Sequence, residues 1–92
     1  MRTMSAFLLL ALLLALSLPA HAQAPSAEQA FGLANGLYDQ ELWDQALDKY
    51  EAFLKGAPQS PNLAFALFRA GECHFSRERY DKALPYYGRA LS

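Results

Sequence analysis

The chain has 92 residues, of which 53% are hydrophobic, and a formal net charge of −1 at pH 7. This length limits it to one small domain. The slightly acidic balance provides no basic face to neutralise phosphates, so no nucleic-acid partner is predicted, and the single cysteine excludes an intramolecular disulfide.

Residues 1–22 have the layout of a cleavable secretory signal peptide. Arg2 is their only charge, residues 6–18 are almost all Leu and Ala, and Ala20-His21-Ala22 is a small-x-small cleavage motif. The apolar stretch is shorter than the roughly 20 residues that span a membrane. No cysteine follows it for lipid attachment. We therefore expect export, cleavage before Gln23, and a mature chain without a membrane span.

The mature chain begins with a short polar lead-in, residues 23–26, followed by a helix. Ser26 and Gln29 have the spacing of a capping box, in which each side chain binds the backbone N–H of the other residue. From Ala27 the apolar residues recur at helical spacing. Residues 39–41 are expected to form a turn that ends this first helix.

A second helical pattern follows from Trp43 to Leu54, so that residues 27–58 form a first helical hairpin. Gly56 lies where a left-handed C-terminal cap is expected. Residues 59–63 are the predicted linker, in which Ser60 is expected to cap the next helix and Pro61 to occupy its first position.

Residues 64–92 form the second hairpin, with a helical pattern up to His74 and a turn at 76–79. The last helix begins near Tyr80, and Pro85 is expected to remove one of its backbone hydrogen bonds and kink it. Its pattern still runs at Ser92, so we expect the helix to be incomplete and more repeats or another domain to follow.

The two hairpins repeat each other at a fixed spacing of 37 residues, the difference between Phe31 and Phe68. Self-similarity at a period of 20–50 residues indicates a solenoid. The identical pairs include Phe31/Phe68, Asp44/Asp81, Ala46/Ala83, Leu47/Leu84 and Tyr50/Tyr87.

Two matching units of this kind closely resemble tetratricopeptide repeats. The pattern of the second unit is Leu67-x-x-Ala70-Gly71-x-x-His74, Tyr80-Asp81-Lys82-Ala83-Leu84 and Tyr87-x-x-Ala90. The pattern of the first is Leu33-Ala34-x-x-Leu37, Trp43-Asp44-Gln45-Ala46-Leu47, Tyr50, Phe53 and Pro58. The spacing exceeds the usual period of about 34 residues, and the surplus lies in residues 59–61. The amino-acid sequence of the second unit is most similar to repeats of bacterial cell-envelope proteins, such as the Tol–Pal coordinator and the lipoproteins of outer-membrane assembly.

The resemblance implies an all-α fold, a right-handed stack of two antiparallel helix pairs. It also implies a concave groove, lined by the first helix of each hairpin, that holds a peptide or helix of a partner protein. We call the matching residues the predicted groove. They are Phe31, Asn35, Tyr38, Phe68, Arg69, Glu72 and Phe75.

No residues of the mature chain form a recognisable catalytic, metal or cofactor site. Cys73 and His74 are neighbours on a helix, where successive side chains point in different directions, so we interpret them as packing residues. His21 leaves with the signal peptide, and His74 is then the only histidine. No phosphate-binding glycine loop is present, so no enzyme activity and no cofactor is predicted.

We therefore expect a protein-interaction scaffold of the periplasm or cell envelope. The alternative is an N-terminal segment of a larger exported cell-envelope enzyme. Because the last helix keeps Tyr80, Tyr87 and Leu91 on uncovered apolar faces, self-association through that helix is a further expectation.

Overall fold

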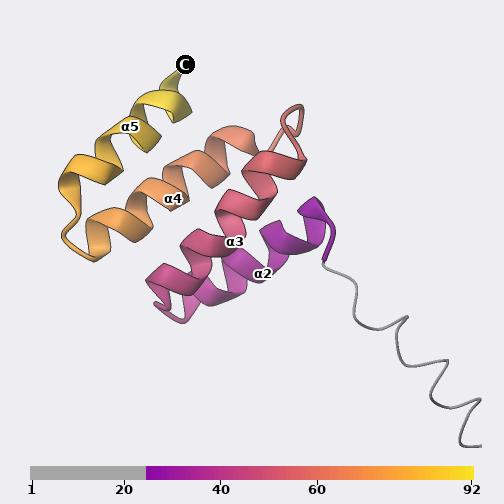
Figure 1. The fold of residues 1–92 in the computed structure, drawn as a ribbon, viewed down its shortest axis with the longest axis horizontal. Helices are drawn as coiled ribbons and strands as arrows, with labels where there is room; N and C mark the ends of the chain where they lie inside the picture. Colours follow the sequence, from indigo (N-terminus) through magenta and orange to yellow (C-terminus); the bar gives the residue numbers. More distant parts are fainter. Residues whose placement is uncertain (1–24) are drawn as a thin grey trace, which may run out of the picture.

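The computed structural model describes residues 25–92, which fold into two helical hairpins (Figure 1). The predicted signal peptide lies outside the described residues, as do Gln23 and Ala24, the first two residues of the predicted mature chain. The four helices are α2 (Ala27–Asp39), α3 (Trp43–Gly56), α4 (Leu63–Ser76) and α5 (Tyr80–Leu91). The all-α fold of two hairpins expected from the sequence is confirmed.

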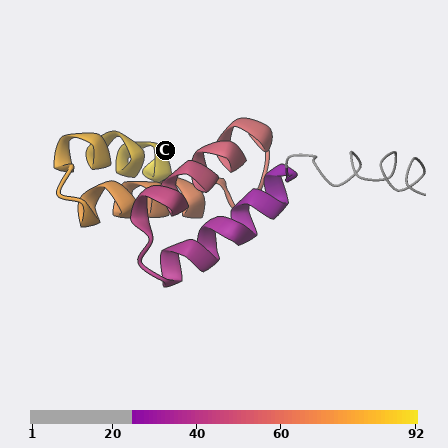
Figure 2. The ribbon, with the colours of Figure 1, turned by 60° about the horizontal axis from the view of Figure 1, so that its bottom comes forward.

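The helices pack in chain order, so that each one contacts mainly its neighbours. α2 packs on α3, α3 on α4 and α4 on α5, whereas α2 touches α4 only slightly. Figures 1 and 2 show the α4–α5 hairpin beside α3, with α2 on the far side. This nearest-neighbour packing is typical of repeat proteins. Within residues 25–92, no helix is both long enough and apolar enough to cross a membrane.

The turns inside the two hairpins have the same backbone geometry. Glu41 and Glu78, one repeat length apart, both have a φ of 60°, in the left-handed region that non-glycine residues seldom adopt. The residue that follows each of them donates its backbone N–H to the carbonyl five residues earlier. The N···O distance is 3.0 Å from Leu42 to Leu37 and 2.9 Å from Arg79 to His74. Each bond satisfies a carbonyl that the end of a helix leaves free.

The start of α2 forms as predicted. The N–H of Gln29 donates to Ser26 Oγ over 3.2 Å, and the N–H of Ser26 donates to Gln29 Oε1 over 2.8 Å. This capping box satisfies two backbone donors that the first turn leaves free. It thereby fixes where the first hairpin begins.

The predicted left-handed cap at Gly56 is wrong. Gly56 is the last residue of α3, and no glycine of the described chain has a positive φ. A Cβ built on Gly56 would lie 2.9 Å from Cβ of Ala27, at the start of α2. Glycine is therefore suited to this position by the close approach of the two helix ends rather than by backbone conformation.

The predicted start of α4 is also wrong. Ser60 Oγ accepts from the N–H of Asn62 over 3.1 Å, inside the linker, and α4 begins at Leu63 without a side-chain cap. Ser60 therefore orders a turn instead of capping the helix. In α5 the helix continues through Pro85, which is exposed, so water can reach the carbonyl that loses its partner.

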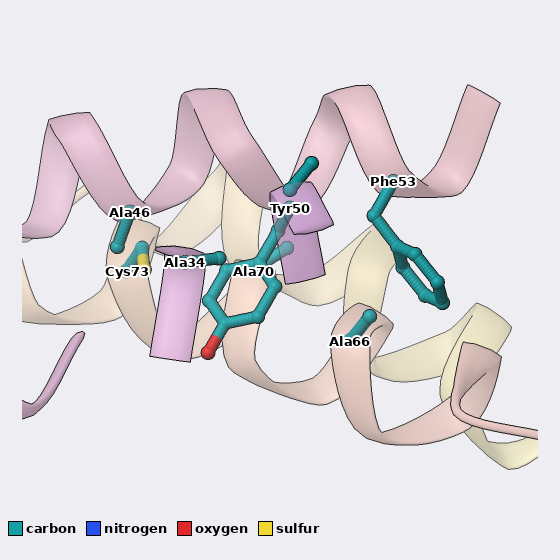
Figure 3. Close-up of a cluster of buried hydrophobic side chains, with 8 residues drawn as sticks. Ala34, Ala46, Tyr50, Phe53, Ala66, Ala70 and Cys73 are labelled. Atoms are coloured by element: carbon teal, nitrogen blue, oxygen red, sulfur yellow. The ribbon is translucent and has the colours of Figure 1, made fainter. Parts of the chain in front are cut away.

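The core lies between the hairpins and is built largely from small residues. Ala34 and Ala46 are fully buried where α2 and α3 cross, and Phe53 of α3 points toward Ala66 of α4 (Figure 3). Small side chains let helix axes approach closely, and the large rings fill the space that remains. The buried cluster consists of Ala30, Ala34, Ala46, Tyr50, Phe53, Ala66, Ala70 and Cys73.

Candidate partner-binding surface

An equivalent hydrogen bond ties the two helices of each hairpin together. In the first hairpin the Tyr50 hydroxyl donates to Asn35 Oδ1 over 2.5 Å. In the second, the Tyr87 hydroxyl donates to a carboxylate oxygen of Glu72. The same positions are used in both repeats, but the acceptor is a neutral amide in the first and a carboxylate in the second. Burial, followed by the bond to Glu72, raises the pKa of Tyr87 above its ordinary value, so its hydroxyl stays protonated.

Arg69 of α4 joins the second hairpin to the first. Its Nη1 donates to Asn35 Oδ1 over 3.2 Å and to the Tyr50 hydroxyl oxygen over 3.4 Å. Its guanidinium lies over the rings of Tyr38 and Phe65, 4.1 and 4.5 Å from their centroids. Such cation–π contacts are stabilising where water is partly excluded. The first-hairpin part of the predicted groove is therefore occupied by this side chain.

Phe31 also contributes to packing inside the structure. Its ring centroid lies 4.8 Å from that of Phe53 in the core and 6.0 Å from that of Phe65 on α4. The side chain is only partly exposed. Edge-to-face and tilted contacts of this kind add to the energy of burial, so Phe31 stabilises the contact between the hairpins.

The second-hairpin part of the predicted groove opens to solvent. Phe68 and Phe75 are 48% and 51% exposed and, with Glu72, they line an open pocket of about 390 Å³. We call it the α4–α5 pocket. Its six lining residues are Phe68, Glu72, Phe75, Tyr87, Ala90 and Leu91.

The structure thus separates the seven residues of the predicted groove into two groups. Phe31, Asn35, Tyr38 and Arg69 meet at the junction of the hairpins, whereas Phe68, Glu72 and Phe75 line the α4–α5 pocket. The sequence analysis did not assign Tyr87, Ala90 and Leu91 of α5 to the binding surface. The 37-residue offset was the signal available, because it pairs these residues with positions of α3 that face α4.

Cys73 and His74 are both buried, as expected of packing residues. Cys73 is 0% exposed, and burial raises the pKa of its thiol to about 11, so the reactive thiolate is scarce at neutral pH. His74 Nδ1 accepts from Nε of Arg79 over 3.0 Å. Among the described residues, no cluster of three or more His, Cys, Asp or Glu side chains is placed to hold a metal ion.

His74 gives the fold a predicted dependence on pH. Burial, and then the nearby Arg79 and Lys82, hold its pKa below 6.5, against a weaker opposing effect of Glu51 and Asp44. The unfolded chain therefore binds a proton first as the pH falls, and stability is lost below pH 6.5. We expect the melting temperature to drop between about pH 7.5 and about pH 5.5.

The matched variant is His74→Leu, because Leu37 occupies the equivalent position of the first hairpin. It removes the titrating group, so its melting temperature is expected to change much less over the same range. Circular dichroism melts of both proteins measure this difference. An equal drop in the two proteins would assign the pH dependence to other groups.

Comparison with known proteins identifies one protein family. Its family model, described as "Tetratricopeptide repeat", matches residues 26–92. Comparisons with curated proteins and with solved structures gave no significant match. The matched segment contains both hairpins and both groups of the predicted groove.

Proposed function

Because the chain belongs to the tetratricopeptide repeat family, whose members are generally non-catalytic protein-interaction scaffolds, we propose that it binds a peptide or a helix of a partner protein in the cell envelope. The α4–α5 pocket is the observation that carries this proposal. It combines half-exposed aromatic rings with a carboxylate on one face of a small domain. Exposed apolar surface rimmed by polar groups is typical of protein-interaction sites.

The energy of such an interface is expected to come from the rings. Phe68 lies against Tyr87 at a centroid distance of 5.8 Å, and Phe75 lies against Tyr80 at 5.0 Å. These contacts hold the rings in place before binding, so little side-chain entropy is lost when a partner covers them. Aromatic side chains are also enriched among residues that dominate binding energy.

We expect Phe68→Ala and Phe75→Ala each to weaken partner binding by about 1–3 kcal/mol, because truncation removes apolar area at the centre of the contact. Lys55→Ala, on an exposed position of α3, is the control and is expected to leave affinity unchanged. Pull-down from envelope extract identifies the partner, and titration of the purified partner measures the affinity. Equal effects at all three positions would contradict binding through the α4–α5 pocket.

The proposed location rests on the layout of residues 1–22. A positive N-terminal residue, an apolar stretch and a small-x-small motif together direct secretion and cleavage. We expect the exported protein to begin at Gln23, and intact-mass measurement of the protein recovered from the envelope tests this directly. Recovery of a membrane-bound species that retains Met1 would contradict cleavage.

A further inference from the structure

One surface of the first hairpin is covered by α4. Phe31, Asn35, Tyr38 and Tyr50 each contact Arg69 or Phe65 of α4. Phe53 lies in the same buried cluster as Ala66, and Leu54 packs against that cluster. The contact of α4 with the first hairpin therefore shows how a hairpin of this type binds a neighbouring helix.

The α4–α5 pocket is the same surface on the second hairpin, without a cover. Adding 37 to the residue numbers of the covered surface gives each of the six pocket residues: Phe68, Glu72, Phe75, Tyr87, Ala90 and Leu91. The ring pairs Phe31–Tyr50 and Phe68–Tyr87 have similar centroid distances, 6.3 and 5.8 Å. The geometry that accepts α4 is thus present a second time.

The face that α4 presents defines what such a surface accepts. Ala66, Ala70 and Cys73 are all 0% exposed and lie on one side of the helix, at the i, i+4 and i+7 spacing. Arg69 lies next to them and reaches the Asn35–Tyr50 pair. A helix with three small residues on one face and an arginine beside them therefore fits the first hairpin.

Two differences between the surfaces change this requirement for the pocket. Glu72 replaces Asn35, so an arginine at the equivalent place would bond to a carboxylate instead of an amide, and a charge-assisted bond is stronger. In the first hairpin the carboxylate near Arg69 is that of Asp39, at 3.9 Å, and Ser76 stands at the equivalent position of the second. In the first hairpin the ring of Phe53 faces Ala66 (Figure 3). In the second hairpin Ala90 replaces Phe53, so the space that this ring fills is left free there. The residue of the incoming helix that faces Ala90 therefore has to be large and apolar.

Neither α2 nor α4 of a second copy meets these requirements. The residues of α2 that are equivalent to the contact face of α4 are Gln29, Gly32, Leu33 and Gly36. They place a polar residue opposite Ala90, glycine where the arginine is needed, and leucine where a small residue is needed. α4 of another copy is already buried in its own molecule.

We propose that the α4–α5 pocket binds an α-helix of a partner protein with the pattern large apolar-x-x-Arg-small-x-x-small, with the arginine on Glu72 and the large residue over Ala90. This rests on the proposed function and specifies its ligand. The arginine approaches the Glu72 carboxylate beside the Tyr87 hydroxyl, and its guanidinium stacks on Phe75 as Arg69 stacks on Tyr38. The small residues pack against Phe68 and Tyr87.

The probe is a labelled peptide of residues 62–76 carrying Ala66→Leu, titrated into the mature protein and followed by fluorescence anisotropy. The unsubstituted peptide is expected to bind several-fold more weakly because it leaves the space over Ala90 empty. The Arg69→Glu peptide is expected to bind about tenfold more weakly or worse, because it opposes two carboxylates.

Variants of the protein distinguish peptide binding in the α4–α5 pocket from binding in which the peptide displaces α4 from the first hairpin. Glu72→Gln keeps an acceptor for Tyr87 and is expected to weaken the arginine peptide about tenfold. Glu72→Arg is expected to reverse the preference, so that the Arg69→Glu peptide binds better than the arginine peptide. Affinities that do not respond to Glu72 would overturn the proposal.

The proposed function is tested separately by the Phe68→Ala and Phe75→Ala variants with the envelope partner. If those variants lose the partner while the peptide series shows no dependence on Glu72, the scaffold function stands and this ligand is wrong. Concentration-dependent sedimentation that Leu91→Glu abolishes would also overturn the proposal, because it would identify a second copy as the occupant of the pocket.

Discussion

Phe53→Ala is expected to lower the free energy of unfolding by about 3–5 kcal/mol. Phe53 is 0% exposed and fills the space between α3 and α4, where its ring also contacts Phe31 at 4.8 Å. The substitution removes apolar contacts and leaves a cavity between the hairpins. Because a domain of this size is stabilised by roughly 3–10 kcal/mol in total, the variant is expected to be largely unfolded at moderate temperature. Urea denaturation followed by circular dichroism measures the loss.

The matched control is Leu84→Ala, on the exposed side of α5. Leu84 is 68% exposed, so its truncation is expected to change stability by no more than about 0.5 kcal/mol. Phe53→Leu keeps most of the apolar volume, so its loss of stability is expected to lie between those of Phe53→Ala and Leu84→Ala. Similar losses in Phe53→Ala and Leu84→Ala would contradict a core located between the hairpins.

Gly71→Ala is expected to destabilise the second hairpin by about 1–3 kcal/mol. A Cβ at this position would lie 2.6 and 2.7 Å from two ring carbons of Tyr87. The ring cannot move away freely, because its hydroxyl is bonded to Glu72 and the ring packs against Phe68 in a tilted contact. The loss is therefore expected even though alanine favours a helix more than glycine does.

Gly36→Ala is the control for helix propensity. A Cβ built on Gly36 in α2 has no atom within 4 Å, so this variant is expected to gain about 0.5–1 kcal/mol of stability. Both variants can be measured in the same urea titration. A gain at Gly71 similar to that at Gly36 would show that the α4–α5 crossing is looser than the structure indicates.

The sequence predicted the helices well where the determining interactions are local. Ser26 and Gln29 act within one turn, so the start of α2 was readable from their spacing. Gly56 was misinterpreted because its constraint comes from Ala27, which is distant in the sequence and adjacent only in the folded hairpin. The start of α4 was missed because Ser60 can cap a helix or order a turn, and the sequence does not distinguish the two.

The family resemblance predicted one groove, whereas the structure divides its residues between the hairpin junction and the α4–α5 pocket. The family resemblance assigned the groove to the first helix of each hairpin, and the 37-residue repeat aligned the aromatic residues there. Neither showed that Arg69 occupies one half of the predicted groove. Which half stays open depends on the order of packing, since α4 covers the first hairpin and no described segment covers the second.

The repeat of one surface at both hairpins also bears on polymerisation. A stack of like units ends in a template for the next unit, and head-to-tail contacts that do not close into a ring grow into filaments. Growth of that kind would require α2 of one molecule to imitate α4 on the α4–α5 pocket of another. Gly32 stands where α4 carries Arg69, and Leu33 stands where α4 carries Ala70. These mismatches work against filament growth through the α4–α5 pocket.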